Sequence, residues 1–195
     1  MRLILARHGQ SESNVNPDYQ GLNAPLTKLG EQQAHLLGQW LRDHEPTIDQ
    51  ILCSPLKRAF DTANIVNEYL KLPIAINDDL EEMREFVLAS LPQRQHPLKP
   101  DTEYITPEAS PYYGIYREQV QRALDFLTQE LDRVKPILVV SHGGTMATLL
   151  RLIMGRHDLR LNTNNTAIID VAWSEGRWHI GALNMTRHLP DEFIT

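Results

Sequence analysis

The chain has 195 residues, of which 42% are hydrophobic and 23% are charged. This length and composition are typical of one compact globular domain and exclude a disordered or collagen-like protein. A formal net charge of −6, without any long run of Lys or Arg, disfavours nucleic acid as a partner.

The sequence favours a cytoplasmic location. The single cysteine, Cys53, cannot form a disulfide within the chain and suits a reducing compartment. Apolar runs such as residues 137–140 are far too short to cross a membrane. The apolar residues 3–6 stand directly before Arg7 and are too few for the apolar stretch of a signal peptide. We therefore expect no membrane partner.

Three short apolar runs indicate buried strands. They are residues 3–6, 50–53 and 137–140. Consecutive apolar positions are typical of central strands in a parallel sheet that helices cover on both faces. Near the end of the chain, residues 167–173 and 178–183 flank the turn sequence Ser174-Glu175-Gly176-Arg177, which predicts a hairpin.

Four segments between these strands have apolar residues at helical spacing. The residues are Ala34, Leu37 and Leu41; Ala59, Ala63, Val66 and Leu70; Val120, Leu124, Leu127, Leu131 and Val134; and Leu149, Leu150 and Ile153. We expect the first helix to begin near Thr27, Ser54-Pro55 to cap the second, and the fourth to follow Gly144 and end at Gly155. This alternation predicts an α/β fold around a mainly parallel, mixed sheet with a hairpin at one side.

Residues 86–113 interrupt the alternation. They hold Pro92, Pro97, Pro100, Pro107 and Pro111, five of the 12 prolines in the chain, together with Tyr104, Tyr112 and Tyr113. A long loop of this kind is usually a lid or a disordered insertion, and the tyrosines, which can pack, favour a lid. We expect a single domain over residues 1–195 with a lid-like insertion at about residues 86–115.

One local pattern occurs twice, since His8 and His142 each follow an apolar strand and precede a glycine. Ligands of open parallel sheets bind outside the carboxyl ends of the strands, so parallel strands would bring both histidines to one edge. The helix expected after Gly143 would present free N–H groups to an anion. A single histidine at a strand end is more often structural, but two in matched settings, one beside Arg7, favour a binding site.

The end of a strand, where the chain turns into the next segment, is called a corner here. His8 and His142 lie at two such corners. Arg58 lies at a third, because it follows the strand at residues 50–53 in the first turn of a predicted helix. Cations are usually avoided there because they oppose the helix dipole, and a bound anion would remove that objection. Alone, Arg58 would more often point into solvent. Two arginines and two histidines around one anion fit the charge and bidentate geometry of phosphate recognition.

These motifs together resemble the histidine phosphatase superfamily, in the branch typified by cofactor-dependent phosphoglycerate mutase. The motifs are Arg7-His8-Gly9, residues 54–59 with Thr62-Ala63, and Ser141-His142-Gly143-Gly144, supported by residues 11–14, 21–34, 80–82 and 184–189. The resemblance covers nearly the whole chain except the proline-rich loop. It implies a three-layer α/β/α sandwich and a small phosphorylated substrate.

The resemblance also implies residue roles. His8 resembles the nucleophilic histidine of the superfamily, which takes the phosphoryl group and becomes a phosphohistidine. It must attack as a neutral imidazole, and the nearby Arg7, Arg58 and His142 should disfavour its protonated form and bind the phosphoryl oxygens.

Four further residues match binding positions of the branch. Asn14 and the backbone N–H of Gly143 are similar to groups that contact the phosphate. Gln20 and Gly21 match positions that line the substrate pocket.

Glu82 matches the general acid that protonates the leaving oxygen and later deprotonates water. Acidic clusters are usually solvated surfaces, and Glu81 and Glu85 are the other candidates. No cofactor is implied and no metal is expected, because the histidine spacings contain no ligand motif.

We therefore expect a metal-independent phosphatase that hydrolyses a phosphomonoester. A phosphoglycerate mutase-type phosphotransferase is the first alternative, although the paired arginines that such mutases use are not recognisable. The second alternative is a non-catalytic protein that binds a phosphorylated ligand, since residues 83–86 replace the Gly and the following Trp-Glu-Gly of many phosphatases of the branch. The oligomeric state stays open, with a homodimer among the alternatives.

Overall fold

The computed structural model describes residues 1–16, 18–21, 23–82, 87, 90–92, 111–129 and 133–195. Its described strands form one sheet: β1 (Arg2–Arg7), β2 (Gln50–Cys53), β3 (Ile74–Ile76), β4 (Ile137–Ser141), β5 (Ile168–Ser174) and β6 (Arg177–Met185). The helices are α1 (Glu12–Val15), α2 (Lys28–His44), α3 (Lys57–Leu70), α5 (Pro111–Leu127) and α6 (Gly143–Met154), with short 3₁₀ helices at Asp78–Leu80 and Asp191–Phe193. Within the described residues, every helix is too short or too polar to cross a lipid bilayer.

The sheet has the order β3-β2-β4-β1-β5-β6. The first four of these strands pair in parallel, whereas β5 runs antiparallel to both β1 and β6. This confirms the predicted mixed sheet with a hairpin at one side. The turn of the hairpin has Glu175 and Gly176 at positive φ, 52° and 73°, as tight two-residue hairpin turns require.

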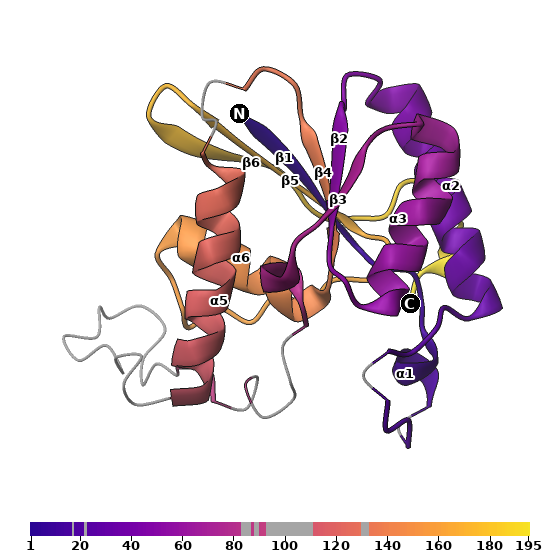
Figure 1. Cartoon of the computed structure of the whole chain (residues 1–195), viewed down its shortest axis with the longest axis horizontal. Coiled ribbons are helices and arrows are strands. Elements are labelled where there is room, and N and C mark those ends of the chain that lie inside the picture. Colours follow the sequence, from indigo (N-terminus) through magenta and orange to yellow (C-terminus); the bar gives the residue numbers. More distant parts are fainter. Residues whose placement is uncertain (17, 22, 83–86, 88–89, 93–110, 130–132) are drawn as a thin grey trace.

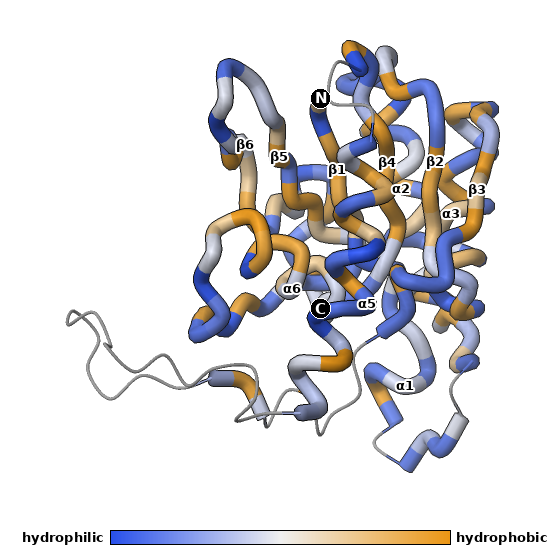
Figure 2. Tube along the Cα trace, turned by 60° about the vertical axis from the view of Figure 1, so that its left-hand side comes forward, coloured by the Kyte–Doolittle hydropathy of each residue, from blue (hydrophilic) through white to orange (hydrophobic). Residues whose placement is uncertain are grey.

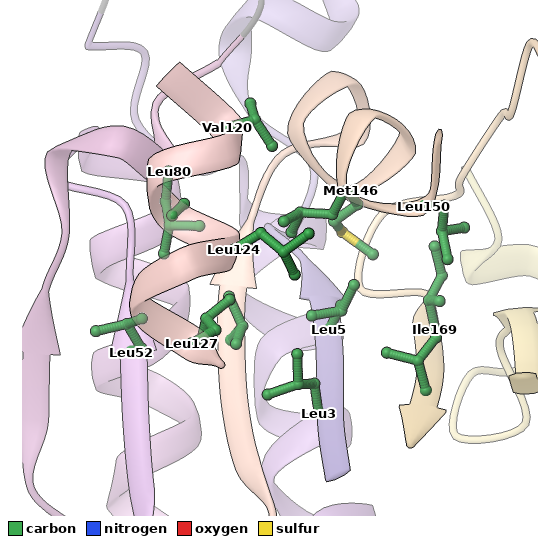
Figure 3. Close-up of a cluster of buried hydrophobic side chains, with 14 of the residues drawn as sticks. Leu3, Leu5, Leu52, Leu80, Val120, Leu124, Leu127, Met146, Leu150 and Ile169 are labelled. Carbon is green, nitrogen blue, oxygen red and sulfur yellow. The ribbon is translucent and has the colours of Figure 1, made fainter. Parts of the chain in front are cut away.

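Helices cover both faces of the sheet, so the fold is a three-layer α/β/α sandwich (Figure 1). Successive side chains of a strand point to opposite faces, and β1 therefore contributes to two cores. Leu3 and Leu5 pack with α5 and α6 (Figure 3), while Ile4 and Ala6 pack with α2 and α3. Figure 2 shows the resulting apolar stretches along the central strands β1, β4 and β2.

The predicted boundaries of two helices are confirmed. Thr27 is the N-cap of α2, where its side chain accepts a hydrogen bond from the Gly30 backbone N–H. Gly155 ends α6 at a φ of 63°, in the left-handed region that glycine adopts without steric cost.

The prediction that Ser54-Pro55 caps the second helix is wrong. Leu56 is the N-cap of α3, and the helix begins at Lys57. Ser54 is fully buried, and its hydroxyl contacts His142 Nε2 at 2.8 Å. The side chain of Asn23 instead accepts a hydrogen bond from the Lys57 N–H, at 3.3 Å.

The predicted limits of the third helix and of the insertion also need correction. Helix α5 ends at Leu127, and Val134 beyond it is 92% exposed rather than part of a helix face. The helix begins at Pro111, so Tyr112 and Tyr113 are helical and do not belong to a loop. Proline suits a first helical turn, and Tyr113 is fully buried. Leu131 and most of the predicted insertion, Tyr104 included, lie outside the described residues.

Candidate active site

The two histidine corners lie side by side at the carboxyl edge of the sheet. Strands β1 and β4 are parallel neighbours, with Arg7 paired to Ser141. His8 and His142 follow these two residues, and their ring centroids are 5.1 Å apart. The His8 backbone N–H donates to the Ser141 carbonyl at 2.9 Å, which joins the corners. Both histidines are buried, at 1% and 0% exposure.

The hydrogen bonds of His8 define its tautomer. Nδ1 lies 2.7 Å from the Gly9 carbonyl, which can only accept, so Nδ1 carries the proton. Nε2 therefore holds a lone pair, which accepts a hydrogen bond from Arg58 Nε at 3.2 Å. Burial lowers the pKa of His8 well below its ordinary value, and the charges of Arg7 and Arg58 lower it further. His8 is thus a neutral imidazole whose Nε2 can act as a nucleophile.

Arg7 and Arg58 bring two permanent positive charges to His8. Arg58 stands in the first turn of α3, as predicted, and is only 7% exposed. Burial lowers the pKa of both guanidinium groups, while the carboxylate of Glu82 opposes this shift in each. The Thr62 hydroxyl donates to the Arg58 carbonyl at 2.7 Å and accepts from the Gly9 N–H at 3.0 Å, which fixes α3 against the His8 corner.

His142 is the N-cap of α6, so the free N–H groups of this helix open at the site. Its Nε2 contacts Ser54 Oγ at 2.8 Å, and its Nδ1 lies 3.7 Å from Glu82 Oε2. Burial is the main reason why the pKa of His142 lies well below its ordinary value, and the neighbouring His8, Arg58 and Arg7 add to the shift. Ser54, which has the sequence features of a helix cap, is therefore a site residue that local sequence patterns do not reveal.

The backbone that carries Glu82 is fixed by hydrogen bonds from distant elements. The Leu80 carbonyl accepts from the Ser141 hydroxyl at 2.8 Å. The Glu81 carbonyl accepts from the hydroxyls of Thr145 and Tyr116 at 2.9 and 3.0 Å. The side chain of Glu82 is 26% exposed, whereas Glu81 is an exposed residue.

Of the two predicted acids in the described part of the chain, Glu82 is the one that lies near His142 and acts on the two arginines. Glu85 lies outside the described residues.

The predicted binding residues Asn14, Gln20 and Gly21 differ in how they are connected to the site. Asn14 is linked to His8, because Asn165 Nδ2 donates to both the Asn14 side-chain oxygen and the His8 carbonyl, at 3.2 and 3.0 Å. Gln20 is exposed, and within the described residues no hydrogen bond joins it to the site. Gly21 is exposed, and its neighbour in the described part of the chain is the ring of Tyr19.

Tyr19 lies against Gly21, the predicted pocket residue, and acts electrostatically on Arg58. A Cβ built on Gly21 would lie 2.8 Å from the Tyr19 ring. The phenol of Tyr19 also raises the pKa of Arg58, against the stronger effect of burial. No local sequence pattern marks Tyr19, so it could not be predicted as a residue near the site.

Three buried polar atoms around the site have no hydrogen-bond partner in the described part of the chain. They are Arg7 Nε, His142 Nδ1 and Thr163 Oγ1. A Cβ built on Gly143 would lie 3.1 Å from Thr163 Oγ1 and 3.7 Å from Arg7 Nε, so glycine keeps the space between them open. Buried polar groups are almost always paired, and an anion could satisfy the two nitrogen atoms.

A metal ion is a weaker match to the same residues. His8, Glu82 and His142 do place one ligand atom each within 4.8 Å of one another, a spacing that could hold a metal. The guanidinium groups of Arg7 and Arg58 would repel a cation there, and Arg58 already donates to His8 Nε2. This surrounding charge favours an anion.

A neutral histidine, two arginines, a helix N-terminus and one carboxylate at the edge of an α/β sheet define a site for phosphoryl transfer. The comparisons with known proteins agree with this class. The chain belongs to the histidine phosphatase superfamily, branch 1, whose family model matches residues 3–186. The resemblance proposed from the motifs is therefore confirmed.

Relatives and solved structures match nearly the full chain. It is 32% identical over 193 residues, and over 96% of both chains, to the uncharacterized phosphatase PhoE of Bacillus subtilis (strain 168). It is 31% identical over 168 residues, and over 80% of each chain, to the adenosylcobalamin/alpha-ribazole phosphatase of Escherichia coli (strain K12). The structure of Bacillus stearothermophilus YhfR has a TM-score of 0.75 at 22% identity, over 96% of this chain and 98% of that one, which shows the shared fold.

A third buried histidine, His188, predicts how stability depends on pH. His188 Nε2 contacts the Thr166 hydroxyl at 3.0 Å, and burial lowers the pKa of His188 from 6.5 to about 4. Between these pH values, His188 is protonated in the unfolded chain and neutral in the folded chain. The free energy of unfolding therefore falls as the pH drops from 6.5 towards 4. His8 and His142, whose pKa values are also lowered, act in the same direction.

Urea unfolding at pH 7 and pH 5 measures this effect. We expect the His188→Gln variant to lose roughly 2 kcal/mol less stability than the wild type between the two pH values, because one titrating group is gone. Glutamine can still hydrogen-bond Thr166, which limits other changes. An equal loss of stability in both proteins would contradict the lowered pKa of His188.

Proposed function

We propose that this protein hydrolyses small phosphomonoesters through a phosphohistidine on His8, without a metal ion. The observation that carries the proposal is the His8 tautomer, in which Nδ1 is held by the Gly9 carbonyl and Nε2 keeps its lone pair beside Arg58. A weakly nucleophilic side chain becomes effective when it is deprotonated, oriented and surrounded by groups that stabilise the transferred charge.

In the first step, His8 Nε2 attacks phosphorus, the N–P bond forms and the ester P–O bond breaks. Glu82, in its protonated form, gives its proton to the leaving oxygen. Arg7, Arg58 and His142 stabilise the phosphoryl oxygens, and the position of His142 at the start of α6 supports this role.

Two predicted binding groups complete the contacts of this step. The Gly143 backbone N–H and the Asn14 side chain would bind the same phosphoryl group. Gln20 and Gly21 would contact the rest of the substrate.

In the second step, the Glu82 carboxylate takes a proton from water, and the resulting hydroxide attacks phosphorus as the N–P bond breaks. Inorganic phosphate leaves, His8 returns to the neutral imidazole and Glu82 is again protonated. Its 26% exposure supports access for water, and its 3.7 Å distance from His142 supports a position near the transferred group.

We further propose that residues 1–195 form a single domain with a lid over the site at its insertion, in the cytoplasm. Cys53 is buried and free, and a chain whose single cysteine is free suits a reducing compartment. The proposed partner is a small phosphorylated substrate, with neither nucleic acid nor membrane.

Phosphate release from a panel of esters tests the proposal. The panel contains p-nitrophenyl phosphate, a sugar phosphate, a nucleotide, 3-phosphoglycerate and α-ribazole phosphate, the last because of the Escherichia coli relative. We expect release from at least one ester, with the same rate in EDTA. Isomerisation of phosphoglycerate without release would favour the mutase alternative. Tight binding of phosphate without release from any ester would favour the non-catalytic alternative.

A further inference from the structure

Residues 163–166, between α6 and β5, contact Arg7 and His8 of the proposed site. The Thr163 carbonyl accepts a hydrogen bond from Arg7 Nη1. The Thr166 N–H donates to the His8 carbonyl at 3.2 Å, and Asn165 Nδ2 donates to the same carbonyl at 3.0 Å. The backbone of His8 is therefore held from a segment more than 150 positions further along the chain.

The side chain of Asn165 connects His8 to Asn14. Asn165 is 2% exposed, and its amide nitrogen donates to the His8 carbonyl and to Asn14 Oδ1. Asn14 Oδ1 also accepts from the backbone N–H and the hydroxyl of Ser11, both at 3.0 Å. The donors of Ser11 and Asn165 all bind the side-chain oxygen of Asn14. The amide nitrogen of Asn14 therefore points away from these donors and can donate to a ligand.

The C-terminal residues hold Asn165 in turn. The Asn165 N–H donates to the Thr195 carbonyl at 2.8 Å, and the Thr195 hydroxyl donates to Asn165 Oδ1 at 3.2 Å. The neighbouring Asn164 N–H donates to Asn184 Oδ1 at 2.7 Å. Both ends of the Asn165 amide are thus hydrogen-bonded, which fixes the direction of its donors.

Thr166 has a backbone conformation that needs such support. Its φ is 56°, in the left-handed region that β-branched residues rarely adopt. Conformations of this kind persist where surrounding contacts determine them, and they cluster at functional sites. Here the Thr166 hydroxyl contacts His188 while its N–H donates to the His8 carbonyl, so the strained residue is fixed on both sides.

We propose that Asn165 is a positioning residue for phosphoryl transfer, which sets the backbone of His8 and the orientation of Asn14 together. The inference rests on the proposed function and adds a residue to it. Attack on phosphorus requires close alignment of His8 Nε2, whereas phosphate binding depends mainly on the charges of Arg7 and Arg58. Loss of the Asn165 donors should therefore reduce turnover more than binding.

Steady-state kinetics of two variants test this. Asn165→Asp keeps the shape and the acceptor for Thr195 but loses both donated hydrogen bonds, and Asn165→Ala loses them all. For an ester that the wild type hydrolyses, we expect kcat to fall by about 10²-fold, because small misplacements of reacting groups have costs of that order. We expect KM to change far less. Asn164→Ala is the matched control, since within the described residues its side chain makes no hydrogen bond.

The ¹⁵N NMR spectrum of the His8 imidazole gives a second readout that needs no turnover. We expect a single Nδ1–H tautomer in the wild type and in Asn164→Ala, and a mixture of tautomers in Asn165→Ala. If both Asn165 variants keep the wild-type kcat, or fall equally in kcat and in affinity for inorganic phosphate, the positioning role is overturned. If the wild type releases no phosphate, the proposed function fails, and an unchanged His8 spectrum in Asn165→Ala then overturns the positioning role separately.

Discussion

Replacing His8 with alanine should reduce phosphate release by at least about 10³-fold, because no other group takes over the nucleophilic step. His8 is the buried imidazole whose Nε2 faces Arg58, and His142 uses its own Nε2 for Ser54. The charges of Arg7 and Arg58 remain in the variant, so inorganic phosphate should still bind. Initial rates and calorimetric titration with phosphate measure the two effects on the same protein.

The matched control for this experiment is His188→Ala, which removes a histidine of similar burial that contacts Thr166 instead of the proposed substrate. Its kcat should fall far less than that of His8→Ala at a temperature where both are folded. Wild-type release by His8→Ala would mean that water attacks the ester directly, and the phosphohistidine route would be rejected.

Replacing Glu82 with glutamine should have the second largest effect, and its size should depend on the leaving group. For an alkyl phosphate we expect kcat to fall by about 10²- to 10⁴-fold, since the leaving oxygen then lacks its acid. For p-nitrophenyl phosphate, whose leaving group needs no proton, the first step should survive. We therefore expect a rapid burst of nitrophenol followed by slow turnover, because water still lacks its base.

Glu81→Gln is the control, since Glu81 is exposed while its carbonyl is bound by Thr145 and Tyr116. It should keep the wild-type rate with both substrates. Full activity of Glu82→Gln together with a loss in Glu81→Gln or Glu85→Gln would assign the acid to one of those neighbours.

The layers of the fold could be predicted because its strands are short apolar runs and its helices have clear periodicity. The matched His8 and His142 corners followed from the same reasoning, since parallel strands must end at one edge. Strand β3 was missed because it has only three residues, Ile74–Ile76, and none of them is fully buried. The start of α5 was missed because Pro111, the first residue of the helix, was assigned to the proline-rich loop.

Long-range hydrogen bonds account for the errors in the site. Ser54 has the sequence features of a helix cap, but His142, 88 positions away, contacts its hydroxyl. Asn165 and Thr163 lie in no motif, and their contacts with His8 and Arg7 depend on how the sheet brings distant segments together. Local patterns therefore identified the groups at the strand ends and missed the residues that hold them.

Trapping the phosphorylated protein tests the central claim most directly. The protein is mixed with a ³²P-labelled ester that it hydrolyses, quenched in alkali within milliseconds and digested for peptide mapping. We predict label that is stable to alkali and labile to acid, carried by the peptide that contains His8 and absent from His8→Ala. Hydrolysis that proceeds without label on this peptide would contradict the account.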